Sequence, residues 1–175
     1  MNRCVLPCLL VTLAASAPAH AVSTGFGWFA DLAGSCWVGM FPDGKSEHTQ
    51  CYTVQFDKFL RGTAALKVER DGAPHAAFAG DSLFAWDDSR RVIIYYIWGS
   101  DGSHRQLEAR YAGDELVFPI PSRADAGKIA SRSVWRRMGN DAFEVRRERP
   151  NGAGWTTELT VTYRRVEGAR AMPGK

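Results

Sequence analysis

Two cysteines stand at the far ends of a stretch with the pattern of a β-hairpin, and they restrict the fold more than any other feature of the chain. Residues 42–45, Pro-Asp-Gly-Lys, favour a type I turn with the proline at its second position. If these residues form the loop, Phe41 faces Ser46, and counting outward places Cys36 opposite Cys51. A non-hydrogen-bonded pair of this kind has Cα atoms about 4.5 Å apart, within reach of a disulfide. The spacing predicts a Cys36–Cys51 disulfide, whereas a three-residue loop with a bulge would shift the register by one residue.

The alternative use of these cysteines is a metal site, because His48 lies close to Cys51 in the sequence. Three ligands on one hairpin, without the Cys-x-x-Cys spacing typical of structural zinc, make a weak site. We therefore favour the disulfide and expect no metal.

The first 21 residues have the pattern of a secretory signal peptide. Arg3 gives a positive start, residues 5–17 form an apolar run, and Ala19-His20-Ala21 matches the small-x-small cleavage rule. Cleavage after Ala21 would leave only the two hairpin cysteines, which suits an oxidising compartment. We expect a periplasmic or secreted protein without a membrane anchor; the alternatives are an uncleaved anchor and a lipoprotein.

Beyond the first hairpin, short segments of strand character alternate with turns rich in glycine, aspartate and asparagine. The segments are residues 50–56, 63–70, 75–86, 92–99, 104–111, 115–118, 131–138, 142–148 and 155–166. Before them, Trp28, Phe29 and Leu32 would share one face of a helical turn that ends at Gly34. The pattern predicts an all-β, up-and-down antiparallel barrel of about 8–10 strands with a short N-terminal helical turn. Residues 22–167 would form this single domain, and residues 168–175 a flexible tail.

Two local features of the strands carry further expectations. Gly80 lies within a long strand and is expected to mark a β-bulge. Pro119 and Pro121 interrupt the strand pattern before the longest loop, residues 122–128.

The start of the first strand resembles the lipocalin family. Gly34-Ser35-Cys36-Trp37 is similar to the motif in which a glycine and a tryptophan open a lipocalin barrel after a helical turn. Arg164 or Arg165 on the last strand would supply the arginine that packs over that tryptophan in lipocalins. The chain also resembles small exported lipocalin-like domains of unknown function, through Trp86-Asp87, Tyr95-Tyr96-Ile97-Trp98 and the closing Tyr163-Arg164-Arg165. The resemblance implies that a small apolar ligand binds inside the barrel.

The candidate ligand site combines aromatic side chains with inward arginines. An arginine inside an apolar barrel would suit a carboxylate or phosphate head group, as in a fatty acid. The residues that we expect to line such a site are Tyr52, Trp86, Tyr96, Trp98, Arg136 and Arg147. The alternative is a barrel filled by its own aromatic side chains, which would work as a structural or interaction protein through its outer surface.

Arginine is concentrated in the last three expected strands, where a basic stripe with Trp135 for stacking would suit nucleic acid. Strand alternation sends adjacent arginines to opposite faces. Glu144, Glu148 and Glu158 lie among them and would form cross-strand ion pairs on the outer wall. We expect no nucleic-acid partner.

Gly80-Asp81-Ser82-Leu83 resembles the nucleophile block of the GDSL hydrolases, and Asp101-x-x-His104 resembles their later Asp-x-x-His block. The two blocks are only about twenty residues apart, and that family has an α/β fold. An esterase that uses Ser82 is the less favoured alternative, and we do not expect an enzyme. Some barrels of this shape hold haem through a late histidine, but His48, His75 and His104 all precede the last three strands, so no cofactor is expected.

Overall fold

The computed structural model describes residues 24–166, which form one short 3-10 helix and ten strands. The elements are η1 (Thr24–Leu32), β1 (Ser35–Met40), β2 (Ser46–Gln55), β3 (Phe59–Arg70), β4 (Ala73–Asp87), β5 (Val92–Gly99), β6 (His104–Ala112), β7 (Glu115–Pro121), β8 (Ile129–Arg137), β9 (Ala142–Asn151) and β10 (Gly154–Val166). The predicted signal peptide and the predicted tail lie outside the described residues.

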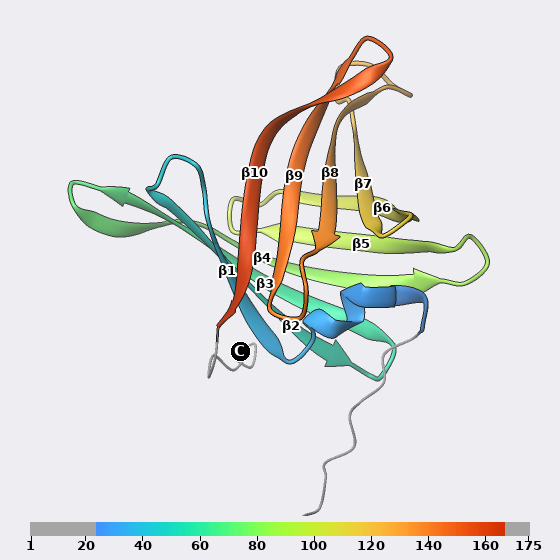
Figure 1. Ribbon diagram of the computed structural model, residues 1–175, viewed down its shortest axis with the longest axis horizontal. Helices are drawn as coiled ribbons and strands as arrows, with labels where there is room; N and C mark the ends of the chain where they lie inside the picture. Colours follow the sequence, from blue (N-terminus) through green and yellow to red (C-terminus); the bar gives the residue numbers. More distant parts are fainter. Residues whose placement is uncertain (1–23, 167–175) are drawn as a thin grey trace, which may run out of the picture.

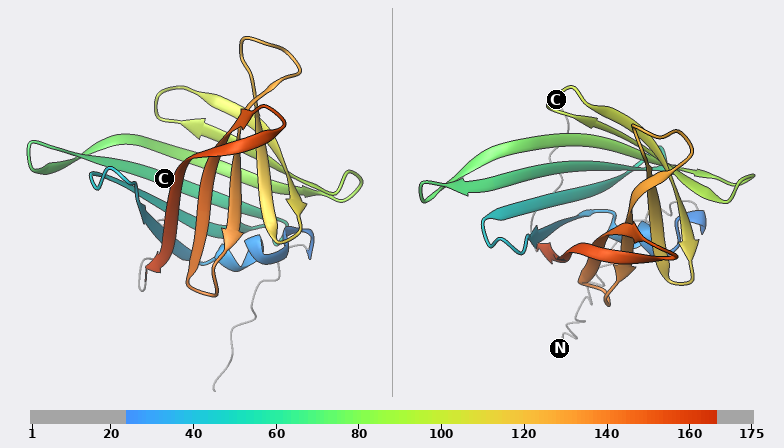
Figure 2. Two further views of the ribbon diagram at one scale, coloured as in Figure 1. Left: turned by 45° about the horizontal axis from the view of Figure 1, so that its top comes forward. Right: turned by 90° about the horizontal axis from the view of Figure 1, so that it is seen from above.

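Each strand pairs antiparallel with its neighbours in the sequence, and β1 closes the barrel against β10. The predicted all-β, up-and-down barrel is therefore confirmed. In Figure 1, β3–β6 run across the view while β7–β10 stand nearly upright, so the wall bends sharply between β6 and β7. Figure 2 shows η1 lying across one end of the barrel, beside the turn from β8 to β9. We call this the plugged end and the opposite one the open end. No helix in the described part of the chain is long and apolar enough to cross a membrane.

The first hairpin has the predicted register. Cys36 is paired with Cys51, and their sulfur atoms form the predicted disulfide. The turn is closed by Phe41, whose N–H donates to the carbonyl oxygen of Ser46 at 2.9 Å. The carboxylate of Asp43 accepts hydrogen bonds from the hydroxyl and the N–H of Ser46, which lower the pKa of Asp43. The turn chemistry thus fixes the register that brings the cysteines together.

The aromatic core fills the plugged half of the barrel. Phe26, Phe29 and Leu32 of η1 are buried and enter the core together. Gly27 has a non-helical conformation, with φ 51° and ψ −140°, so η1 consists of two short helical turns joined by a kink. Phe26 precedes the kink, whereas Phe29 and Leu32 follow it and are three residues apart, which places these two on one side of a 3-10 helix. The predicted face included Trp28 instead of Phe26. Trp28 is only partly buried, and its Nε1 donates to the carbonyl oxygen of Asp114 at 3.0 Å.

The prediction of a bulge at Gly80 is wrong. The register of β3 against β4 shifts between Leu66 and Lys67, so the extra residue of β4 is Ala77. Gly80 is instead paired with Gly99. A Cβ atom at Gly80 would lie 3.0 Å from the ring of Phe78, so this glycine makes room for a neighbouring aromatic side chain.

The two prolines do not end β7 where the sequence suggested. The strand continues to Pro121, and Pro119 stays paired with Arg132 of β8. The prolines instead coincide with lost pairing on the edge of β7 that faces β6, where the last pair is Arg110 with Val117.

Candidate functional site

A cavity of about 200 Å³ lies inside the barrel between the aromatic core and the open end. It is lined by residues of β2–β5, which are His48, Gln50, Tyr52, Gly62, Thr63, Ala64, Phe78, Ser82, Phe84, Tyr95 and Ile97. We call it the His48 cavity. Alternation on β2 brings His48, Gln50 and Tyr52 to the same inner face.

A hydrogen-bonded chain of polar side chains forms one wall of the His48 cavity. The hydroxyl of Tyr52 donates to Oε1 of Gln50, and Nε2 of Gln50 lies 3.3 Å from Nδ1 of His48. The hydroxyl of Tyr163 lies 2.7 Å from the same Nδ1. Two donors converge on Nδ1, so we assign it as the acceptor and place the ring proton on Nε2. The second amide hydrogen of Gln50 and the Nε2–H of His48 are then available to a ligand.

Burial keeps this polar wall uncharged. Desolvation lowers the pKa of His48 to about 4, raises that of Tyr163 to about 12, and raises that of Tyr52 well above its ordinary value. At neutral pH, no residue that lines the His48 cavity carries a full charge. The wall therefore offers hydrogen-bond donors and acceptors without selecting for an ion.

The opposite wall is aromatic and closely packed. The rings of Phe84 and Tyr95 stack with centroids 4.4 Å apart, and Tyr52 contacts Phe84 from the polar side. Ser82 donates its hydroxyl to the carbonyl oxygen of Gly62 at 3.0 Å. A Cβ atom at Gly62 would lie 2.5 Å from that hydroxyl, so the glycine keeps the cavity wall thin at this point.

We expect the buried imidazole of His48 to make the protein less stable in mild acid. The pKa of His48 is about 4 in the folded state against an ordinary value of 6.5, so the unfolded chain binds the proton first. Stability should fall as the pH drops from 6.5 to 4, by at most about 3 kcal/mol, and the contribution should level off below that. Urea unfolding at pH 7 and pH 4.5 measures the loss.

His48→Gln should remove the contribution of His48 to the acid destabilisation. The carboxylates contribute equally in the parent and the variant, so the difference between the two proteins measures the contribution of His48 alone. His104→Gln is the matched control, since His104 is exposed on β6. Equal acid destabilisation of the parent and His48→Gln would contradict the prediction.

The structure separates the aromatic residues that the sequence grouped as ligand-binding. Tyr52 lines the His48 cavity. Trp86 lies at the plugged end, where its ring occupies the space beside Gly25 of η1. Tyr96 and Trp98 lie on the outer face of β5, because the intervening positions of that strand line the cavity. Trp98 is 50% exposed, so neither residue reaches the interior.

The two candidate arginines also lie apart. Arg136 belongs to the outer wall and pairs with Glu144 at 3.3 Å. Arg147 lies on the inner face of β9 near the open end, where its closest acid is Glu158 at 3.9 Å, and it does not line the His48 cavity. The predicted cross-strand pairs are present on the outer wall, where Arg132 and Arg136 of β8 pair with Glu148 and Glu144 of β9, and Arg146 of β9 pairs with Glu115 of β7. Arg146 also contacts Glu144 and Glu148 on its own strand. Trp135, expected to stack on bases in a nucleic-acid site, is buried in the core.

The four residues assigned a structural role lie around the plugged end. Gly34 has a positive φ of 75°, and its N–H donates to the carbonyl oxygen of Tyr52 at 2.8 Å. Trp37 is buried, and the guanidinium of Arg165 lies 4.8 Å from the centre of its ring. Arg164 is paired with Val38 and is exposed.

The residues of the GDSL-like pattern do not assemble. Ser82 points inward and bonds to a backbone carbonyl. Asp81 points outward and forms a salt bridge with Arg61, which lowers the pKa of Asp81. His104 is exposed on the outer face of β6. Among residues 24–166, no histidine or carboxylate is hydrogen-bonded to the Ser82 hydroxyl.

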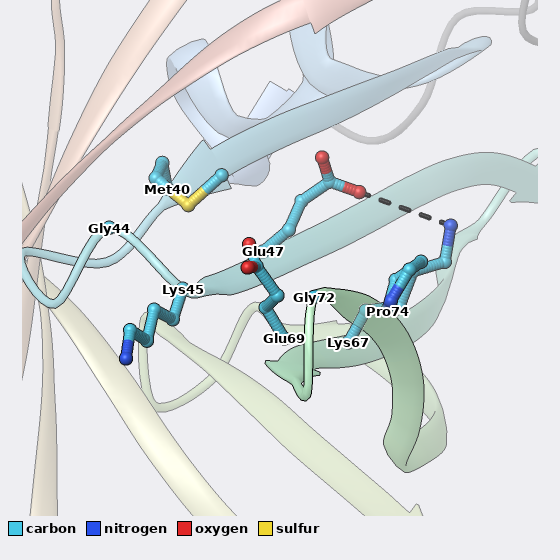
Figure 3. Close-up of a pocket in the computed structure, with 8 residues that line it drawn as sticks. All are labelled: Met40, Gly44, Lys45, Glu47, Lys67, Glu69, Gly72 and Pro74. Carbon is cyan, nitrogen blue, oxygen red and sulfur yellow. Dashed lines mark ion pairs between the residues drawn. The ribbon is translucent and has the colours of Figure 1, made fainter.

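A second hollow, of about 370 Å³, lies outside the barrel between the β1–β2 turn and the β3–β4 hairpin (Figure 3). Lys45, Glu47, Lys67 and Glu69 alternate in charge around it, and Glu47 pairs with Lys67 at 4.0 Å. The balanced charges and the exposure of these side chains give it no preference for an ion of either sign.

Three parts of the site are not predicted from the sequence: His48, Gln50 and Tyr163. Counting back by twos from Tyr52, which was proposed as inward, would have reached Gln50 and His48. Tyr163 lies in the expected strand 155–166, on one face with Leu159 and Val161, but the sequence does not show that it meets His48.

Among solved structures, the chain is similar to the crystal structure of Rv2717c from M. tuberculosis, with a TM-score of 0.54. The sequences are 15% identical, and the match covers 83% of this chain and 99% of that one. No protein-family model matches the chain. No curated protein matches it either. At this identity the likeness shows the fold alone, so the lipocalin-like family stays a prediction.

Proposed function

We propose that the protein is an exported, lipocalin-like barrel that binds a small, uncharged, amphipathic molecule in the His48 cavity. The observation that carries the proposal is that one cavity inside the barrel has a polar wall and an aromatic wall. Pockets of this composition, mostly apolar with a few convergent polar groups, are typical of small-molecule sites. The predicted signal peptide and the disulfide support export.

The size and charge of the cavity define the ligand class. A cavity of 150 Å³ lined by apolar side chains accommodates benzene, so 200 Å³ suits one aromatic ring with small polar substituents. A long fatty acid would need a larger space, and its carboxylate would find no cationic partner in the lining. The neutral donors of His48 and Gln50 favour a hydroxyl, carbonyl or ring nitrogen.

Titration calorimetry with four probes tests the proposal: indole and phenol as neutral ligands, benzoate as an anion, and hexadecanoate as a fatty acid. We expect indole and phenol to bind with dissociation constants near about 1 mM, which corresponds to about −4 kcal/mol, and benzoate to bind more weakly. Tighter binding of benzoate or hexadecanoate would contradict the neutral ligand class.

A pair of variants on β3 shows whether binding occurs in the cavity. Ala64 lines the His48 cavity, and Ala65 is the next residue on the opposite face of the same strand. Ala64→Met should weaken indole binding at least tenfold by filling the space, whereas Ala65→Met should leave it unchanged. Equal affinities in the two variants, or no binding to the parent, would favour the filled barrel that works through its outer surface.

A further inference from the structure

The barrel wall has a slot where β6 and β7 separate. The two strands are paired only from Ala112 and Glu115, beside their turn, to Arg110 and Val117. The remaining part of β6 is paired on its other edge with β5, up to His104. Figure 1 shows that the strands on either side of this hairpin, β5 and β8, run in different directions, so β6 and β7 diverge away from their turn.

Two prolines explain why the pairing stops at that point. In an antiparallel hairpin with a two-residue turn, hydrogen-bonded pairs recur at every second position. The next hydrogen-bonded partners of β6 on β7 would be Pro119, opposite Glu108, and Pro121, opposite Gln106. Neither proline has an N–H to donate. The edge of β7 is thereby blocked, while Glu108 and Gln106 turn their N–H and C=O groups toward the slot.

The slot is hollow and carries positive charge. A cavity of about 270 Å³ is lined by residues 104–107 of β6 and residues 120–123 at the end of β7 and the start of the following loop. Arg105 and Arg123 belong to this lining, which contains no acidic residue. Both arginines are exposed, and no salt bridge to either is found among the described residues. Hydrogen bonds from Ser103 lower the pKa of Asp101 in the β5–β6 turn, and the charge of Arg105 also acts on that carboxylate and contributes to the lowered pKa.

We propose that the slot binds an extended peptide segment, which pairs with the edge of β6 as an added strand and places an acidic side chain near Arg105 and Arg123. Unpaired strand edges are templates for pairing with another chain, and several peptide-binding domains use this mode. An extended backbone offers donors and acceptors at the spacing of the free groups on Gln106 and Glu108. The two arginines supply the charge complementarity that selects an acid.

The test uses hydrogen exchange of the full chain with capped nonapeptides that alternate threonine and valine. Three central residues are compared: aspartate, lysine and proline. At about 1 mM, the aspartate peptide should slow exchange of the Gln106 and Glu108 amide hydrogens at least tenfold. The lysine peptide should do so less, and the proline peptide should have no effect. Protection that is equal for all three peptides, or absent with all three, would overturn the proposal.

Two substitutions separate edge pairing from other binding. Pro119→Val supplies the missing N–H, so it should extend the pairing to Glu108, protect that amide without peptide, and abolish the peptide effect. Gln106→Pro removes a donor on the slot side without touching the bonds to β5, and it should also abolish the effect. Pro74→Val, on β4, is the matched control and should change neither measurement.

The occupant is tested by the oligomeric state. Sedimentation of the peptide-free protein should show a monomer. The amide hydrogen of Glu108 should then exchange at the same rate at low and high protein concentration. Protection of Glu108 that grows with protein concentration would assign the edge to a second copy of the chain and overturn the peptide assignment. Loss of indole binding in the His48 cavity would leave this result unaffected, because the slot shares no lining residue with that cavity.

Discussion

Replacing Trp37 with alanine is expected to lower the free energy of unfolding by about 3–5 kcal/mol, the range for emptying a large aromatic residue from a core. The side chain is 1% exposed and packs edge-on against Phe143 at 5.3 Å between ring centroids. Its Nε1 donates to the carbonyl oxygen of Leu32 at 3.2 Å, so it also ties β1 to the end of η1. A total stability of about 5–15 kcal/mol leaves little margin for such a loss.

Urea unfolding followed by far-ultraviolet circular dichroism measures this loss, and two arginines provide a matched comparison. Arg165→Ala should destabilise the barrel by about 1 kcal/mol, since its guanidinium lies over the Trp37 ring but is partly solvated. Arg164→Ala should change stability by less than about 0.5 kcal/mol, because that side chain is exposed. A Trp37→Ala protein that unfolds at nearly the parent's urea concentration would show that Trp37 does not hold the plugged end together.

The hairpin register could be predicted from the sequence because turn chemistry and the cysteines specify it independently. The proline, aspartate and glycine of the turn fix the loop length, and Asp43 closes it with its own carboxylate. Cys36 and Cys51 then mark a pair that only one register satisfies. Agreement between local turn residues and a long-range bond makes a sequence signal reliable.

The inward face of β5 could not be predicted because the strand does not alternate. Val92, Ile93 and Ile94 are all buried, so hydropathy does not distinguish the two sides. Tyr95 faces the cavity, whereas Tyr96 faces outward. The choice depends on the register against β4, which pairs Tyr95 with Phe84 and Tyr96 with Leu83 and which no turn residue specifies in the sequence.

The outer wall contains a buried residue whose direction the sequence does not show. Because side chains alternate along a strand, an inward Arg136 requires that Val134 also point into the barrel. Val134 is fully buried, yet it lies on the outer face, next to the inward Trp135 and paired with Arg146. The stems of long charged side chains can cover an apolar residue from outside, so burial on a barrel strand does not imply that the residue faces inward.

The polar wall of the site was missed for a physical reason as well. Residues 46–52, Ser-Glu-His-Thr-Gln-Cys-Tyr, are polar on both faces of β2, so no apolar alternation marks the inner side. His48 and Gln50 can lie inside because they satisfy each other and the Tyr163 hydroxyl. A buried polar network depends on partners from other strands, here β10, and single-strand patterns do not contain that information.

The second large effect is expected at Phe29, the residue by which η1 enters the barrel. Its side chain is fully buried, and its ring lies 4.8 Å from Phe84, 5.6 Å from Tyr52 and 5.7 Å from Trp135. η1 consists of two short 3-10 turns joined by a kink at Gly27, which have little stability of their own, so their position depends on these contacts. Phe29→Ala should therefore lower the free energy of unfolding by about 3–5 kcal/mol.

Phe29→Ala should also change the ligand site, because Tyr52 and Phe84 contact Phe29 on one side and line the His48 cavity on the other. Loss of the ring leaves space next to the aromatic wall, and we expect a folded Phe29→Ala protein to bind indole more tightly than the parent. Trp28→Ala is the control, since Trp28 is partly buried and lies outside the cavity lining; it should destabilise the barrel less and leave indole affinity unchanged. Calorimetry and urea unfolding on the same samples measure both effects. If Phe29→Ala lowers the free energy of unfolding no more than Trp28→Ala does, η1 covers the barrel end without packing into it. The division of the barrel into a packed half and a ligand-binding half would then be wrong.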